Sequence, residues 1–387
     1  MELTLFTQML QDKHFTDYKK MQYKYGKDFD EFLHDLEKVF YRPLPLVDFD
    51  GNPLVYTENV PAISKSINRF LMKPNNGSFG IKAAEDEIIS TSAIEGIDFN
   101  RESVRNILKG YAPKDEQEAR IAGLKKGFEF IAEPTNRINE ENLYTLYMMT
   151  VGDFLNEENK LQNGYKYRHD AVYVVDDSAV VHAGIDHKKL TGCMKALVDF
   201  INAEDSINDL LKAAIVHFYI AYLHPYFDGN GRMARLVHLW VLIQSGYQSV
   251  LYVPLSSKIK SSKKAYYDAF TKIEANAKIS GRVDVTPFLI YFVNEVYDRI
   301  TKEDTAAPTF AVFDEAQKEG KITEKEAQLW QFVFSAYGTH EFSTKQLEKD
   351  FGNAAYATIR SFVLKFEKIG LLTSVKYGTR VKYKVLV

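Results

Sequence analysis

The sequence of 387 residues contains one cysteine, Cys193. A single thiol cannot form a disulfide within the chain, so nothing indicates an oxidising compartment. Met1–His14 has no basic segment followed by an apolar one, so we expect no signal peptide. The longest apolar run, Ala213–Leu223, is interrupted by His217 and is too short to span a bilayer. These absences predict a cytoplasmic protein that does not enter a membrane.

The chain also lacks a strong charge of either sign. Its formal net charge is −3, which gives no reason to expect a nucleic-acid-binding protein as a whole. The composition, 45% hydrophobic and 26% charged, is that of a soluble globular protein. The length predicts two or three domains with a sizeable core.

One polar segment, His224–Arg235, lies between two apolar runs of helical length, Ala213–Leu223 and Leu236–Ile243. This pattern predicts a tight loop that opens a helix between buried elements. The two glycines of the segment, Gly229 and Gly231, allow the backbone to approach an anion closely. The free N–H groups and the dipole of the following helix favour phosphate oxygens. The segment therefore predicts a phosphate-binding loop.

The charged residues of this loop suit transfer chemistry on a phosphate. Asp228 is a hard oxygen ligand that can hold Mg²⁺ against a diphosphate. Arg232 and Arg235 are three residues apart on one helix face and can reach the same polyphosphate. His224 precedes the loop and can accept a proton from an attacking hydroxyl. The glycine spacing matches neither the P-loop nor the dinucleotide fingerprint.

The segment resembles the signature of the Fic (filamentation induced by cAMP) family, His-Pro-Phe-x-[Asp/Glu]-Gly-Asn-Gly-Arg-x-x-Arg, with Tyr226 in place of Phe. The resemblance implies a mainly α core that binds ATP with Mg²⁺. It also implies transfer of AMP to a protein Tyr, Thr or Ser hydroxyl, with release of pyrophosphate. The Doc-type kinases of this superfamily have Lys where Gly231 stands, which argues against a phosphorylating relative.

The resemblance gives each residue of the loop a role. It implies His224 as the general base and Asp228 as the metal ligand. It also implies that five further residues bind the phosphates of ATP. Gly229, Asn230 and Gly231 form a backbone cradle, and the arginines Arg232 and Arg235 contribute positive charge. Tyr267 follows the core helix, as in relatives where such a Tyr packs near the adenine. Glu274 or Asn276 lies near the place of an accompanying Asn.

A second stretch, Thr91–Gly96, resembles the inhibitory motif of the family, [Ser/Thr]-x-x-x-Glu-[Gly/Asn]. It ends a helix predicted over 80–96, because Gly96 is a typical helix stop. Its position ahead of the core resembles the subclass with an N-terminal inhibitory helix. The resemblance implies that Glu95 pairs with Arg235 and leaves ATP misaligned for attack. An ordinary helix end is the alternative interpretation of this stretch.

Residues 168–183 change from helical to alternating periodicity. Ala171–Val175 and Ala179–His182 flank a polar tip, which predicts a β-hairpin. The hairpin occupies the place of the family's flap, whose edge aligns a target segment by strand addition. The implied partner is a target protein docked on 168–183, and a purely structural ribbon is the alternative.

The rest of the chain completes the predicted domain organisation. Residues 1–78 form an N-terminal helical or irregular region, 79–304 the Fic-type core, and 305–321 a linker. Residues 322–387 read as three helices and a hairpin, the winged-helix pattern. The predicted fold is therefore mainly α, with a flap hairpin and a C-terminal winged-helix domain. The subclass resemblance also implies a homodimer.

Three functions remain open at this level. The leading prediction is a self-inhibited protein adenylyltransferase that uses ATP and Mg²⁺. The second is removal of AMP from modified proteins, with Glu95 orienting a water molecule. The third is a DNA-binding regulator that acts through 322–387, a segment that contains ten Lys or Arg and six Asp or Glu. A protein partner for this region is the alternative to DNA.

Overall fold

The computed structural model describes residues 1–58, 60, 63, 67–68, 81–176, 179–247, 250–251, 253–303, 307–337 and 341–386. The chain divides into two compact units. The first comprises residues 1–64, 134–245 and 259–297, and the second comprises 65–133, 246–258 and 298–387. The described elements are mostly helices, accompanied by three separate two-stranded antiparallel sheets. The predicted mainly α fold is confirmed. No helix in the described ranges is long and apolar enough to cross a membrane.

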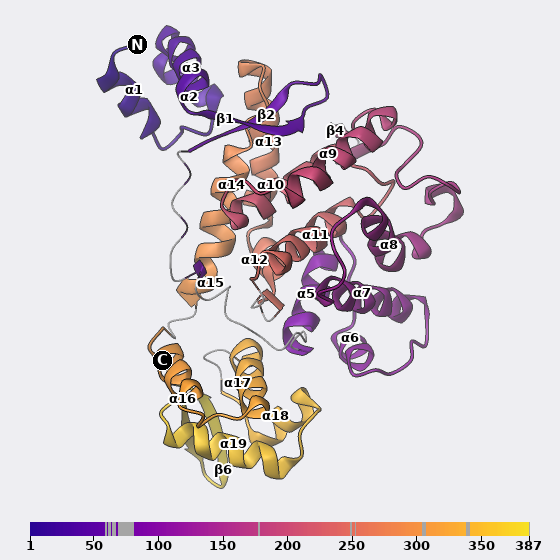
Figure 1. Cartoon of the computed structure of the whole chain (residues 1–387), viewed down its shortest axis with the longest axis vertical. Helices are drawn as coiled ribbons and strands as arrows, with labels where there is room; N and C mark the ends of the chain where they lie inside the picture. Colours follow the sequence, from indigo (N-terminus) through magenta and orange to yellow (C-terminus); the bar gives the residue numbers. More distant parts are fainter. Residues whose placement is uncertain are drawn as a thin grey trace. The chain divides into compact units, whose positions relative to one another are not determined.

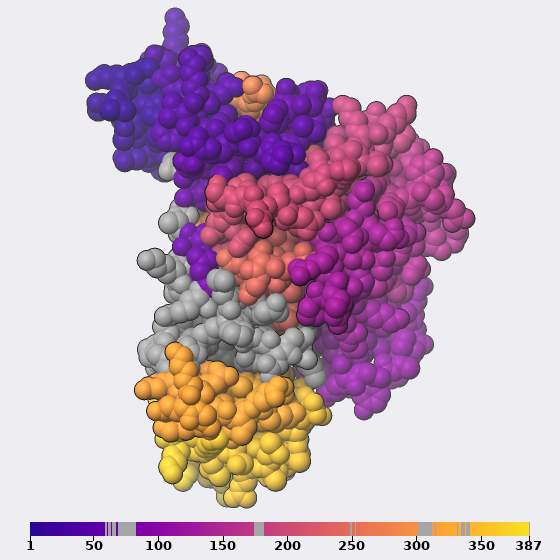
Figure 2. Space-filling model, viewed as in Figure 1, coloured from indigo at the N-terminus to yellow at the C-terminus, as the bar shows by residue number. Residues whose placement is uncertain are grey.

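The N-terminal region of the first unit is folded around its own aromatic core. It consists of α1 Leu3–Leu10, α2 Tyr18–Tyr25, α3 Lys27–Val39, β1 Tyr41–Val47 and β2 Pro53–Thr57. Phe6, Phe29 and Phe32 are buried in this core. Strand β2 also bonds to the helical core, because the Val55 amide donates to the Val283 carbonyl at 3.0 Å. In Figure 2 the indigo atoms of this region lie directly against the pink atoms near α9. Residues 69–78 of the predicted N-terminal region lie outside the described residues.

The helical core of the first unit is built around α10 and α11, which pack side by side (Figure 1). Both helices are buried over most of their length, as their apolar sequences require. Helix α11 begins at Asn230, inside the segment His224–Arg235, so this segment does open a helix as predicted. The bounds in this core are α8 Glu140–Thr150, η1 Gly152–Phe154, η2 Glu157–Asn159, η3 His187–Lys189, α9 Leu190–Asn202, α10 Asp209–Leu223, α11 Asn230–Gln244, α13 Lys263–Ser280, α14 Thr286–Tyr291 and a π-helical turn Phe292–Tyr297.

The predicted hairpin is present in the first unit. Its strands are β3 Tyr173–Asp176 and β4 Ala179–Ala183, and they pair antiparallel with an irregularity between Val174 and Val175. Residues 168–172 precede the hairpin without forming a strand. The tip residues 177 and 178 lie outside the described residues.

The second unit contains the helix that carries Glu95. Its first part consists of α5 Ile81–Ile94, α6 Arg101–Leu108 and α7 Glu116–Ala132, and the division between the units falls inside α12 Leu255–Ser261. The buried Glu85 carboxylate of α5 pairs with Arg101 and Arg105 of α6. Glu87 accepts hydrogen bonds from the backbone amide and hydroxyl of Ser256. These contacts fix α5 within its unit.

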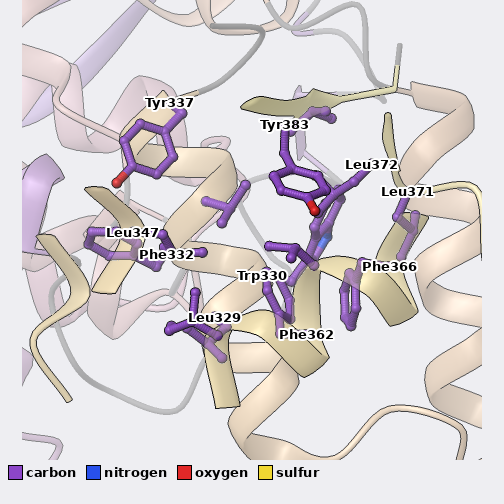
Figure 3. Packing of buried hydrophobic residues seen from close by; sticks show 14 of the residues in the cluster. Leu329, Trp330, Phe332, Tyr337, Leu347, Phe362, Phe366, Leu371, Leu372 and Tyr383 are labelled. Atoms are coloured by element: carbon purple, nitrogen blue, oxygen red, sulfur yellow. The ribbon is translucent and has the colours of Figure 1, made fainter. Parts of the chain in front are cut away.

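The C-terminal part of the second unit has the predicted order of three helices and a hairpin. The elements are α17 Glu324–Tyr337, α18 Thr344–Phe351, α19 Tyr356–Lys368, β5 Leu372–Tyr377 and β6 Arg380–Val385, preceded by α15 Asp298–Glu303. Trp330 lies in the middle of their apolar core, with its ring centroid 5.5 Å from that of Phe366 (Figure 3). A further backbone pairing joins Phe342 to Tyr383 of β6.

The linker predicted over 305–321 is wrong over most of its length. These residues contain α16 Ala307–Lys318. Phe313 and Ala316 of this helix are buried in the C-terminal core, and the Phe313 ring stacks on Trp330 at 5.9 Å. The prediction rested on the segment Thr305–Pro308, but proline is tolerated in the first turn of a helix.

Candidate active site

The predicted loop 224–235 joins the buried helices α10 and α11. His224 follows α10 directly and has φ 54° and ψ 61°, the left-handed conformation. It is the only non-glycine residue with positive φ in the described part of the chain. An L-residue with a Cβ pays roughly 1–2 kcal/mol for this conformation. The surrounding structure must therefore hold His224 in place, which is typical of functional residues.

Hydrogen bonds at His224 fix both its backbone and its ring. The backbone amide donates to the Ile220 carbonyl at 3.1 Å. The Nδ1 atom lies 3.2 Å from the Ala221 carbonyl oxygen. A carbonyl oxygen only accepts, so Nδ1 carries the proton and Nε2 has the lone pair in the neutral ring. This is the tautomer that a general base needs.

Arg168 is a residue of this site that the sequence interpretation missed. Its guanidinium is buried and donates to three carbonyl oxygens: His224 at 2.7 Å, Asp170 at 2.6 Å, and Ile185. The Arg168 amide also donates to the Pro225 carbonyl at 2.9 Å. Arg168 thereby ties the loop to both ends of the flap hairpin. Burial lowers the pKa of Arg168.

Asn230 closes the loop through its side chain. Its Oδ1 accepts from the Tyr226 amide at 2.9 Å, and its Nδ2 donates to the Tyr226 carbonyl at 2.8 Å. The Tyr226 ring stacks on Tyr147 of α8, with centroids 3.8 Å apart and planes 6° apart. The Asn230 side chain is therefore used to hold the loop, which leaves its backbone N–H for the predicted phosphate cradle.

Position 229 requires glycine for two independent reasons. Its φ is 80°, and a Cβ built on it would lie 2.5 Å from Cγ1 of Val151. Asn230 and Gly231 form the first turn of α11, where backbone N–H groups have no partner within the helix. A helix of this length with such a start is a suitable site for an anion.

The charged residues of the loop lie around this helix start. The Asp228 carboxylate is 56% exposed, and its Oδ2 is 3.5 Å from a terminal nitrogen of Arg232. The Arg232 and Arg235 side chains are buried at the start of α11. No group of three or more His, Cys, Asp or Glu that could hold a metal occurs in the described residues. An exposed single carboxylate suits Mg²⁺ that takes its other ligands from phosphate and water.

The three residues proposed near the adenine have different neighbours in the structure. Tyr267 of α13 is 44% exposed, and the Lys263 ammonium lies 5.9 Å from its ring centroid. Asn276 binds the N-terminal region instead, since it accepts from the Tyr18 amide at 3.0 Å and donates to the Thr16 carbonyl. Glu274 lies 2.8 Å from the ring of His182 in the flap.

Glu95 belongs to the second unit. It follows the last residue of α5, and the next residue, Gly96, has φ 76°, as predicted for a helix stop. Thr91 and Ser92 of the same stretch are buried. The helix of the predicted inhibitory motif is therefore confirmed, while the pairing of Glu95 with Arg235 stays a prediction.

Comparison with known proteins places this site in a family. Residues 137–242 match the model of the Fic/DOC family. The chain contains a Fic/DOC family domain. The matched range contains α8, the flap, α10, the whole loop 224–235 and all of α11 up to residue 242. The resemblance to the Fic signature is thereby confirmed.

Two relatives and one solved structure show how far the similarity extends. The chain is 31% identical to protein adenylyltransferase fic-1 of Caenorhabditis elegans over 100 residues, 25% of this chain and 17% of that protein. It is 25% identical to protein adenylyltransferase Fic of Culex quinquefasciatus over 230 residues, 56% of this chain and 41% of that protein. The matches thus span less than half the length of either relative. A crystal structure of a Fic family protein from Desulfovibrio desulfuricans G20 aligns with TM-score 0.47 and 18% identity, over 84% of this chain and 97% of that one.

Proposed function

We propose that this Fic protein is a self-inhibited protein adenylyltransferase. The observation that carries the proposal is the hydrogen bond from His224 Nδ1 to the Ala221 carbonyl. It leaves Nε2 as a proton acceptor at the mouth of a loop whose next element is a helix N-terminus. A base next to an anion site is the arrangement that nucleotidyl transfer requires. The names of the two relatives, both protein adenylyltransferases, support AMP as the transferred group.

The residues of the loop divide the reaction between them. His224 Nε2 takes the proton of a Tyr, Thr or Ser hydroxyl as its oxygen attacks the α-phosphorus of ATP. The new P–O bond forms as the bond to pyrophosphate breaks. Arg232, Arg235 and the N–H groups of α11 stabilise the charge on the phosphate oxygens. Asp228 would hold Mg²⁺, which supplies further positive charge against the diphosphate.

The inhibitory part of the proposal concerns Glu95. A carboxylate that reached Arg235 would occupy the guanidinium needed for the γ-phosphate, so that ATP would bind in a pose unsuited to attack. Removal of this carboxylate should raise activity, whereas removal of the base should abolish it. The two substitutions therefore test different parts of one proposal.

The test uses the full-length protein with ATP labelled at the α-phosphate. Glu95→Gly should increase self-labelling over the wild type, and Glu95→Gly combined with His224→Ala should show none. Equal labelling of the wild type and the Glu95 variant would overturn self-inhibition. Labelled UTP, CTP and GTP in the same assay identify the nucleotide. If the labelled protein loses AMP faster with Glu95 present than without it, removal of AMP is the main reaction.

The C-terminal hairpin gives a separate proposal about partners. Four basic residues of this hairpin are exposed: Lys376 on β5 and Arg380, Lys382 and Lys384 on β6. We expect them to contact phosphates if this region binds duplex DNA, so the affinity should fall steeply with salt. Binding of a labelled duplex to the full-length protein between 50 and 200 mM salt, compared with a Lys382→Glu/Lys384→Glu variant, tests this. Binding that is unaffected by salt and by both substitutions would favour a protein partner.

A further inference from the structure

His182 in strand β4 of the flap connects three elements of the first unit. Its Nδ1 lies 2.8 Å from the Glu274 carboxylate of α13. Its Nε2 lies 2.8 Å from the backbone carbonyl of Tyr222, in the last turn of α10. The His182 side chain is 17% exposed and that of Glu274 is 37% exposed. One ring thus joins the flap to the helix that ends at the catalytic loop.

Both neighbours of the His182 ring are hydrogen-bond acceptors. A carboxylate and a carbonyl oxygen have no proton to donate, so each ring nitrogen must donate in order to bond. The doubly protonated ring satisfies both acceptors, whereas either neutral tautomer satisfies only one. Hydrogen bonds from a charged donor are shorter and stronger than neutral ones. The arrangement is that of a two-ended clamp.

The tip of the N-terminal hairpin covers this clamp. The Phe49 ring stacks on Tyr222 with centroids 4.3 Å apart and lies 5.9 Å from the ring of His182. Lys189, close to the end of the flap, donates to the Phe49 carbonyl at 2.7 Å. An aromatic cover limits access of water to the two hydrogen bonds and so strengthens them. The N-terminal region, for which the sequence indicated no role, thereby supports the active site.

The clamp is close to the catalytic base. The rings of His182 and His224 have centroids 6.2 Å apart. Tyr222, whose carbonyl the clamp binds, is two residues before His224. We propose that His182 is a positioning residue: through Tyr222 and Glu274 it fixes the flap relative to His224. This inference rests on the proposed function, because it concerns the alignment of the target hydroxyl with the base.

Loss of the clamp should affect the transfer step more than nucleotide binding. Neither partner of the His182 ring, Glu274 or Tyr222, belongs to the phosphate-binding residues 228–235, so the half-saturating ATP concentration should change less than twofold. Misalignment of the attacking hydroxyl by about 1 Å can lower the rate roughly 100-fold. We therefore expect His182→Ala to lower the maximal rate at least tenfold. If His182 served only stability, the folded fraction of His182→Ala would keep both the maximal rate and the half-saturating ATP concentration of the wild type.

The first experiment measures self-labelling with α-labelled ATP over a range of ATP concentrations. The variants are His182→Ala, Glu274→Gln and their combination, each in the Glu95→Gly background. His187→Ala is the matched control, because His187 lies five residues along the same segment outside the clamp. The combination should be no slower than His182→Ala alone, since both substitutions break one unit. Additive losses, or losses equal to those of His187→Ala, would overturn the proposal.

The second experiment does not depend on activity. Hydrogen–deuterium exchange measured by mass spectrometry should show faster exchange in peptides covering 179–186 in His182→Ala and in Glu274→Gln. His187→Ala should leave those peptides unchanged. If no variant transfers a nucleotide but the flap still loosens, the proposed function fails while the clamp stands. Unchanged exchange in both clamp variants would refute the clamp, even if transfer is observed.

Discussion

The side chain of Asn230 bonds to both backbone groups of Tyr226, at 2.9 Å and 2.8 Å. An amide can donate and accept at once, but a carboxylate can only accept. Asn230→Asp should therefore leave the buried Tyr226 carbonyl without its donor and bring a negative charge toward it. We expect a loss of about 1–3 kcal/mol, because unsatisfied buried polar groups are costly. Chemical denaturation with the labelling assay measures this loss.

The control for this change is Asn142→Asp. Asn142 is a half-buried residue near the start of α8, and its side chain donates to the Arg137 carbonyl in an exposed hydrogen bond of 2.8 Å. The same chemical change at this position should cost less than about 1 kcal/mol, because water can replace the lost donor. Similar losses at both positions would contradict the account of Asn230.

Gly229 and Val151 form a second pair that can be tested in combination. A Cβ at position 229 would lie 2.5 Å from one Val151 methyl and 2.7 Å from the other. Gly229→Ala should therefore destabilise the protein and lower nucleotide transfer. Adding Val151→Ala removes both methyl groups and leaves only Val151 Cβ, at 3.1 Å, so the double variant should recover part of the stability. The remaining loss of about 1–2 kcal/mol reflects the positive φ. A double variant that is less stable than Gly229→Ala alone would refute this explanation.

The sequence was sufficient to predict the loop and its helices, because the information is local. The order of His224, Asp228, two glycines and two arginines is contained in twelve consecutive residues between apolar runs. The left-handed conformation of His224 was not predictable, since glycine usually takes this conformation at a helix end. Only the packing around Ala221 and Arg168 explains it.

The residues that were missed act over long distances in the sequence. Arg168 reaches His224 across 56 residues, and His182 reaches Glu274 across 92. The periodicity of a sequence does not indicate such long-range pairs. A charged residue just before a predicted hairpin is only a weak indication of a buried contact. Asn276 is the opposite case, a residue that was assigned to the site but lies elsewhere. Its position relative to Tyr267 suggested an adenine contact, but its amide binds backbone groups of residues 16 and 18.

Gly184, directly after strand β4 of the flap, lies close to His224, the proposed base. A Cβ on Gly184 would lie 2.6 Å from a terminal nitrogen of Arg168, 2.8 Å from Val172 Cγ1 and 3.1 Å from His224 Cβ. Arg168 cannot move away cheaply, because its side chain is buried and makes three hydrogen bonds. Gly184→Ala should therefore displace the base and lower the maximal labelling rate about 10- to 100-fold. Gly192→Ala, where a Cβ meets nothing within 4 Å, is the control. Full activity of Gly184→Ala would show that the base tolerates this displacement.

His238 gives the protein a dependence of stability on pH that is separate from catalysis. It is buried in α11 with Nε2 3.0 Å from the Tyr297 hydroxyl, and burial lowers its pKa to about 3. An unfolded His has a pKa of about 6.5, so the unfolded chain binds one more proton between these values. This group should thus lower the free energy of unfolding by about 1.4 kcal/mol for each unit that the pH falls below 6.5.

Two other buried groups also make the free energy of unfolding depend on pH. Burial lowers the pKa of His217 well below its usual value, so His217 acts in the same direction. Burial raises the pKa of Asp284 to about 6, which opposes the two histidines between about pH 4 and 6. His238→Gln removes one contribution and keeps a hydrogen-bonding group. Urea unfolding at pH 6.5 and pH 5 should show a loss about 2 kcal/mol smaller in this variant than in the wild type. An identical loss in both proteins would mean that His238 does not titrate on unfolding.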